Sequence, residues 1–147
     1  MAPAGMHAAH MTGATTKLQF VLRANAAFSA VGGLLAFVAA SFVSDTAGID
    51  HVILTRLVGL GLLVFAIDVF VTSRQSGARL RQGALLISIA DITWVIASLA
   101  VIVTVDLTTI GVVVGLIQAT AVLDFGVTQH WLRSRAESPK VAATAAA

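Results

Sequence analysis

Four long apolar runs constrain this chain of 147 residues more than any other feature. A transmembrane helix needs about 20 apolar residues, because each residue adds about 1.5 Å towards roughly 30 Å of hydrocarbon. In the first run, residues 24–44 carry no charged side chain. The runs predict an all-α, four-helix transmembrane bundle with spans at about 18–43, 55–73, 83–105 and 107–131.

The four spans leave no length for a folded soluble domain. Residues 17–132 form a single four-span transmembrane domain in this interpretation, and residues 1–16 and 133–147 are disordered cytoplasmic tails. Only 11% of the residues are charged, against about 25% in ordinary soluble domains. The first run is also longer than the 7–15 apolar residues usual in a cleaved signal peptide, so we expect it to stay in the protein.

The few charged residues exclude several partners and indicate an orientation. Cysteine is absent and the net charge is only +2, without a dense basic run, so we expect no disulfide and no nucleic-acid partner. Basic residues concentrate in loops on the cytoplasmic side of bacterial membrane proteins. That rule predicts both termini on the cytoplasmic side of a cell inner membrane, together with Lys17, Arg23, Arg74, Arg79, Arg81, Arg133, Arg135 and Lys140.

An internal repeat relates the two halves of the chain. A shift of 56 positions superposes residues 59–72 on residues 115–128 and aligns Asp68 with Asp124. A shift of 66 positions aligns Asn25 with Asp91. The pattern indicates two helical hairpins in parallel repeat, related by an axis along the membrane normal. Chance similarity among apolar runs is the alternative explanation.

Small residues recur every fourth position in two of the predicted spans. Gly32, Ala36 and Ala40 follow this spacing in the first, and Gly111, Gly115 and Ala119 follow it in the fourth. Such spacing lets two helices approach closely. It predicts seams either within the bundle or between protomers.

Polar residues interrupt the apolar runs at similar depths. Asp68, Asp91, Asp124 and Asn25 lie about 13–18 residues from the outer ends of their spans, which is roughly 20–27 Å. A charge at the bilayer centre costs at least about 2.5–3.5 kcal/mol, so we expect these groups inside the bundle or at an oligomer interface. Arg23 precedes Asn25 by two residues, where it either snorkels towards the interface or pairs with a carboxylate. These five residues form the predicted intramembrane polar layer.

The layer has three interpretations. A carboxyl group without a basic partner either keeps a proton or binds a cation, and both make an ion site. The same side chains otherwise act as interhelical hydrogen-bond partners, worth about 0.6 kcal/mol each. The third interpretation is contact with a partner subunit. Four helices enclose little volume, so a larger solute would need several protomers.

Other polar residues carry weaker predictions. Gln118 either extends a polar path or makes a lone hydrogen bond, and Arg56 is expected to anchor the outer interface. His7 and His10 are too few for a metal site, so we predict no metal and no other cofactor. No nucleotide-binding, zinc-protease or nucleophile-elbow motif is present. We therefore predict that the protein is not an enzyme and has no catalytic residue.

Three segments, LRANAAFSAVGGLL, RLVGLGLLVFAID and DITWVIASL, carry a resemblance to known sequences. They are similar to a family of uncharacterised small bacterial four-helix integral membrane proteins, in which an LRANA opening and a DxxWV pattern recur. The resemblance covers the first three spans. It implies four helices in an inner membrane and carries no activity with it.

These observations predict a small polytopic inner-membrane protein with a proton or small-cation site in a transporter or channel-like oligomer. The alternative is a non-catalytic accessory or scaffold subunit, whose carboxylates determine packing. In both cases the expected partners are the lipid bilayer and either further copies of the chain or another membrane subunit.

Overall fold

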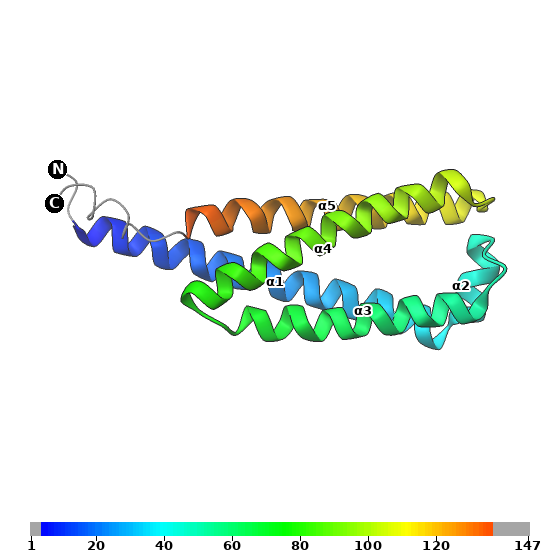
Figure 1. Ribbon diagram of the computed structural model, residues 1–147, viewed down its shortest axis with the longest axis horizontal. Coiled ribbons are helices and arrows are strands. Elements are labelled where there is room, and N and C mark those ends of the chain that lie inside the picture. Colours follow the sequence, from blue (N-terminus) through cyan, green and yellow to red (C-terminus); the bar gives the residue numbers. More distant parts are fainter. Residues whose placement is uncertain (1–3, 137–147) are drawn as a thin grey trace.

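The computed structural model describes residues 4–136, with side chains from residue 13 onward (Figure 1). The described part is all-helical and contains no strand, which confirms the predicted fold class at that level. Its five helices are α1 (Ala4–Val38), α2 (Ala40–Ala47), α3 (Val52–Ser73), α4 (Gly77–Thr104) and α5 (Thr109–Arg135).

Four helices of the described chain are long and apolar enough to cross a membrane, as expected of a multi-pass membrane protein. These segments are Gly13–Val38, Val52–Ser73, Gly77–Thr104 and Thr109–Arg135. The first predicted span differs, because a turn at Ala39 separates α1 from α2.

The helices also extend into the segments predicted as tails. Residues 4–16 belong to α1, whose alanine-rich start favours a helix, and α5 continues to Arg135. The rest of the two predicted tails, residues 1–3 and 137–147, lies outside the described residues.

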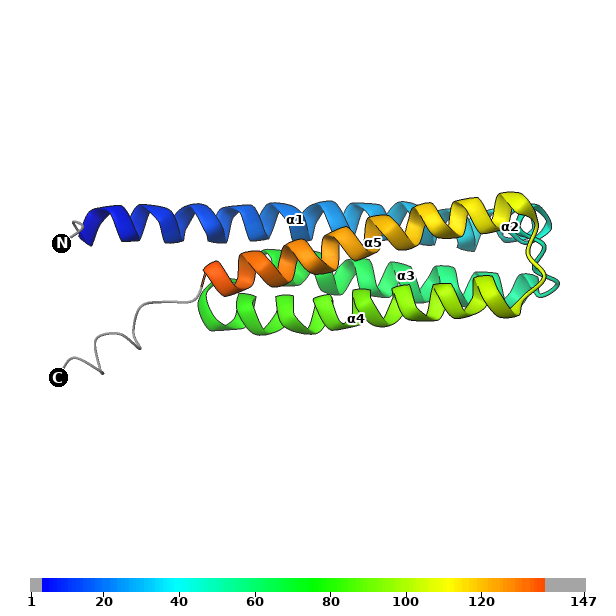
Figure 2. The ribbon, with the colours of Figure 1, turned by 90° about the horizontal axis from the view of Figure 1, so that it is seen from above.

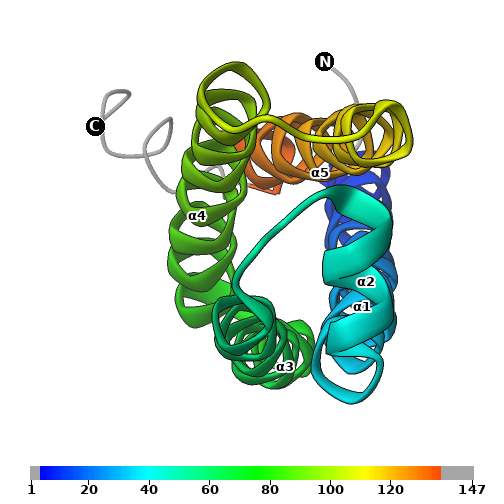
Figure 3. The same cartoon turned by 90° about the vertical axis from the view of Figure 1, so that its right-hand side faces the viewer.

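The four long helices form a ring in the order α1, α3, α4 and α5 when seen along the bundle (Figure 3). The closest pairs are α1 with α3 and α4 with α5, so each pair forms a hairpin. Helix α4 starts beside the end of α3 and then diverges from it towards α5 (Figures 1 and 2). The bundle therefore consists of two hairpins that separate along part of their length.

Glycines permit the close approach of α1 and α3. A Cβ atom on Gly59 would lie 2.6 Å from the backbone nitrogen of Phe37, and one on Gly33 would lie 2.9 Å from the carbonyl oxygen of Gly59. The seam thus uses Gly33, whereas a Cβ on the neighbouring Gly32 would meet nothing within 4 Å. The spacing of small residues predicts a seam in this helix but places it one residue away.

Two clusters of apolar side chains stabilise the bundle, one between the two hairpins and one within the α4–α5 hairpin. The larger one joins all four long helices near the end at which α1 begins, and includes Leu22, Val69, Ile87 and Leu132. The smaller one, with Val95 and Val122, joins only α4 and α5. Packing between the two hairpins is therefore concentrated at one end of the bundle.

At the opposite end, backbone contacts connect the hairpins. The amide of Thr108 donates to the carbonyl oxygen of Ala47 at 3.0 Å, and the Thr108 hydroxyl donates to the carbonyl oxygen of Thr46. Gly48 ends α2 with φ of 79°, a left-handed conformation that favours glycine. These contacts tie the end of α2 to the start of α5.

Large apolar side chains cover the outward faces of the helices. Phe42, Ile53 and Val103 are 72%, 75% and 80% exposed, and similar residues continue along every helix. Soluble monomers rarely expose contiguous apolar patches larger than a few hundred Å². The surface therefore suits a lipid environment.

Candidate functional site

A buried polar centre lies where three helices meet. Asn25 of α1 donates from Nδ2 to Oδ2 of Asp91 of α4 at 2.9 Å, and Gln129 of α5 donates from Nε2 to the same oxygen at 3.3 Å. Ser29 donates from its hydroxyl to Oδ1 of Asn25 at 3.3 Å. All four side chains are buried, with Asp91 only 2% exposed. We call these residues the Asp91 centre.

Helical periodicity turns these side chains inward. Asp91 shares the buried face of α4 with Leu80, Ala84, Ile87 and Ser88, at the spacing expected for one face of a helix. Gly126 brings α5 close to this face, since a Cβ on it would lie 3.3 Å from the Cβ of Asp91. Gln129 follows three residues later and so reaches Asp91 from the same side of α5.

The Asp91 centre contains one ionisable group and no basic residue. Both hydrogen-bond partners of Asp91 in the described chain are neutral amides. Charge in a low-dielectric interior is costly unless it is paired, and amide dipoles compensate for it only in part. A proton or a cation on Asp91 would remove that cost.

Two polar atoms near the centre lack partners among the described residues. They are Oε1 of Gln129 and Nε1 of Trp94, and both are buried. An unsatisfied buried polar atom costs about 1–3 kcal/mol. The centre is therefore not fully satisfied by the protein alone.

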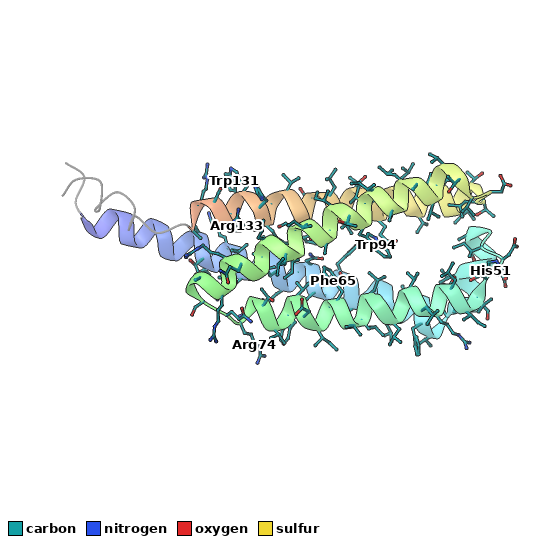
Figure 4. The ribbon with its side chains drawn as sticks, in the orientation of Figure 1. His51, Phe65, Arg74, Trp94, Trp131 and Arg133 are labelled. Atoms are coloured by element: carbon teal, nitrogen blue, oxygen red, sulfur yellow. The ribbon has the colours of Figure 1, made fainter. Side chains whose placement is uncertain are left out.

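A cavity of about 510 Å³ lies between the hairpins and extends to Asp91. All four long helices line it, mainly with apolar side chains. Phe65 of α3 and Trp94 of α4 both point into the space between the hairpins (Figure 4). Gln118 lines the same cavity further from the Asp91 centre. One protomer thus encloses more volume than the sequence led us to expect.

The structure brings together only two members of the predicted polar layer, Asn25 and Asp91. Asp68, Asp124 and Arg23 are all exposed on the outer surface of the bundle, and so is Arg56 near the opposite end. No ion pair involves Arg23 within the part of the chain that the structure describes. A single layer of all five residues does not form inside one protomer.

The outward carboxylates nevertheless lie close to the depth of the centre. Asp124 adjoins Phe125, whose ring centroid lies 5.8 Å from that of Phe28 in α1. Asp68 lies next to Val69, which packs in the same cluster as Leu22. What separates these carboxylates from Asp91 is the direction that they face, not their position along the bundle.

Sequence reasoning missed Gln129 and Ser29. Gln129 lies near the end of the predicted fourth span, where a polar residue is unremarkable. Its spacing from Gln118 is eleven residues, which is close to three helical turns and places both on one face. Asp124, five residues before Gln129, lies about 140° away around the helix. This comparison of angles around the helix could have shown that Gln129 shares a face with Gln118 and that Asp124 lies on another face.

No group of three His, Asp or Glu side chains in the described residues could hold a metal ion. Comparison with known proteins adds no identity: no protein-family model, curated protein or solved structure matches the chain.

Proposed function

We propose that this protein carries a proton or a small cation through the membrane by way of the Asp91 centre. The observation that carries the proposal is a buried carboxyl group held only by neutral amides at the edge of a membrane-embedded cavity. Intramembrane carboxyl groups facing a bundle interior commonly mark ion or proton pathways. No catalytic chemistry is proposed.

The proposed orientation has both termini in the cytoplasm and the chain in a cell inner membrane. Arg74 and Arg133 lie at one end of the bundle and His51 at the other (Figure 4). Lys17 and the basic α3–α4 connection belong to the same end as Arg74, which supports this orientation under the positive-inside rule.

We also infer that the hairpins are a parallel repeat. A two-fold axis along the bundle would place α1 opposite α4 and α3 opposite α5, and the observed ring has this order. Residues near such an axis meet their own equivalents. The contact between Asn25 and Asp91, which the repeat aligns, supports that relationship.

The transporting unit in this proposal is an oligomer of the chain. Asp68 and Asp124 face outward at membrane depth, where lipid offers them no partner. Arg23 is also exposed and lies two residues from Asn25, hence within about 3 Å of its depth. Copies inserted in one orientation share depths, so Arg23 of one copy is available to a carboxylate of the next.

The test is flux through purified protein reconstituted in liposomes. We expect wild type to dissipate a proton or monovalent-cation gradient, and Asp91→Asn to reduce the rate to that of empty liposomes. Asp106→Asn removes an exposed carboxylate from the α4–α5 connection and should leave the flux unchanged. Equal flux in wild type and Asp91→Asn would overturn the proposal.

The outward carboxylates favour one second candidate, an accessory or scaffold subunit of a membrane complex. In that case Asp68 and Asp124 contact another protein and the Asp91 centre only determines packing. The chain alone would then show no flux. Asp68→Asn with Asp124→Asn would lose a co-purifying membrane subunit that Asp91→Asn retains.

A further inference from the structure

The cavity between the hairpins has the size and lining of a small-molecule site. Its volume of about 510 Å³ falls within the roughly 300–1,000 Å³ typical of ligand pockets. Such pockets combine apolar walls with a few polar groups that orient the ligand. Here the walls come from all four long helices, and the polar groups are few.

The charge of the cavity selects the kind of ligand. Among the described residues that line it, Asp91 is the only ionisable side chain, and it is nine-tenths or more buried. No basic residue lines the cavity in the described part of the chain, so an anion would find no positively charged partner there. An uncharged lipid chain would fill the volume but would offer the ionised carboxyl group no partner.

Aromatic side chains lie close to this carboxyl group. Trp94 follows Asp91 by three residues and so shares its face of α4. Phe28 and Phe65 line the same cavity from α1 and α3. Aromatic faces attract cations, and the attraction is stronger where water is excluded. The combination of a buried acid with three aromatic walls suits a positively charged group on an apolar body.

Two glycines create part of the space. Gly32 of α1 and Gly61 of α3 both line the cavity, and a Cβ on either would meet nothing within 4 Å. They differ in this respect from Gly33 and Gly59, where neighbouring backbone atoms occupy the space that a Cβ would need. The room beside Gly32 and Gly61 is therefore not needed for packing of α1 against α3.

We propose that the cavity binds a hydrophobic organic cation, with its charge at Asp91 and its apolar body against Phe28, Phe65 and Trp94. The inference rests on the proposed function, because it assigns a larger cation to the carboxyl group that otherwise takes a proton or a small cation.

The test compares two probes of similar shape and opposite charge, tetraphenylphosphonium and tetraphenylborate. Binding to the full chain in lipid nanodiscs is measured by titration calorimetry and by the fluorescence of Trp94 in a Trp131→Phe background. We expect saturable binding of the phosphonium only. Similar binding of both ions, or none of the phosphonium, would overturn the inference.

Variants locate the bound probe. Asp91→Asn should weaken phosphonium binding at least tenfold, and Gly61→Leu should do the same by filling the cavity while it retains Asp91. Gly13→Leu is the matched control, since Gly13 also faces open space but does not line the cavity. Binding that survives Gly61→Leu, or that Gly13→Leu weakens equally, would contradict the assigned location.

A separate measurement distinguishes the two proposals. Infrared difference spectra of the wild type without probe report the carboxylic-acid stretch of Asp91 when it takes up a proton. Proton-coupled flux and an Asp91 signal without phosphonium binding would refute only the organic-cation inference. Phosphonium binding without proton or small-cation flux would refute only the proposed function.

Discussion

Asp91 and Asp124 lie at similar depths in neighbouring helices, but their surroundings are opposite. Asp91 is buried and accepts hydrogen bonds from Asn25 and Gln129. Asp124 faces outward, and so does Asp68 on α3. Depth alone therefore does not assign a role to an acid in a membrane. In the proposed function, the inward acid takes a proton or a cation, whereas the outward acids contact a neighbouring protein.

Reversing the charge at each position should give the largest contrast. Asp91→Lys buries an ammonium group with no carboxylate among the described neighbours to pair with it, so we expect a loss of roughly 3–5 kcal/mol in the free energy of unfolding. Aspartate and lysine have similar costs of insertion into the membrane, so Asp124→Lys should change the free energy of unfolding by less than about 1 kcal/mol. Denaturation of the detergent-solubilised monomer measures both. Equal losses would mean that the two sites do not differ in surroundings.

Removing the closest partner of Asp91 should have a smaller effect. Asn25→Leu keeps a similar volume but removes the donor at 2.9 Å, leaving Asp91 with one amide. We expect a loss of about 1–3 kcal/mol in the same denaturation experiment. Arg23→Leu on the outward face of α1 serves as the control and should stay within about 0.5 kcal/mol. A control that destabilises as much as Asn25→Leu would contradict the inward role of Asn25.

Neutralising the outward acids should affect association rather than folding. We expect Asp68→Asn with Asp124→Asn to raise the dissociation constant of the oligomer about tenfold, equivalent to about 1.4 kcal/mol. The chain has no cysteine, so single introduced cysteines can carry dyes for energy transfer between protomers in liposomes. Asp106→Asn should leave the transfer unchanged. Unaltered energy transfer in the double variant would show that these acids do not stabilise the interface between protomers.

Gln129→Leu should give the smallest change. The substitution removes a 3.3 Å hydrogen bond but also removes an oxygen that has no partner in the described structure. The loss of the hydrogen bond and the removal of the unpartnered oxygen have opposite effects, so we expect the free energy of unfolding to change by less than about 1 kcal/mol. Gln118→Leu, on the same face of α5, is the comparison. A loss above 2 kcal/mol at Gln129 would show that its free oxygen is in fact bonded.

Much of this fold follows from apolar length, which identifies four long helices without any knowledge of contacts. The same reasoning misses the turn at Ala39, because no proline or glycine lies at that position. It also selects Gly32 for the α1 seam when the packing uses Gly33. A shift of one residue rotates a helix face by about 100°, and only the packed partner decides which glycine is used.

The candidate site was predictable in part. Asn25 and Asp91 stand out as polar residues in apolar runs, and the repeat aligns them with each other. The outward direction of the Asp68 and Asp124 side chains was not predictable from their depth, since residues at one depth can lie on either side of a helix. Gln129 was missed because it lies near the end of the predicted fourth span, where a polar residue does not stand out.

The tie between Ala47 and Thr108 has a consequence for the route to the cavity. Backbone hydrogen bonding joins the hairpins at that end, and the larger apolar cluster joins them at the other. We therefore expect a hydrophobic organic cation to arrive sideways, from within the hydrocarbon, rather than along the bundle axis. Its arrival rate would then follow its partition coefficient into the bilayer more closely than its concentration in water.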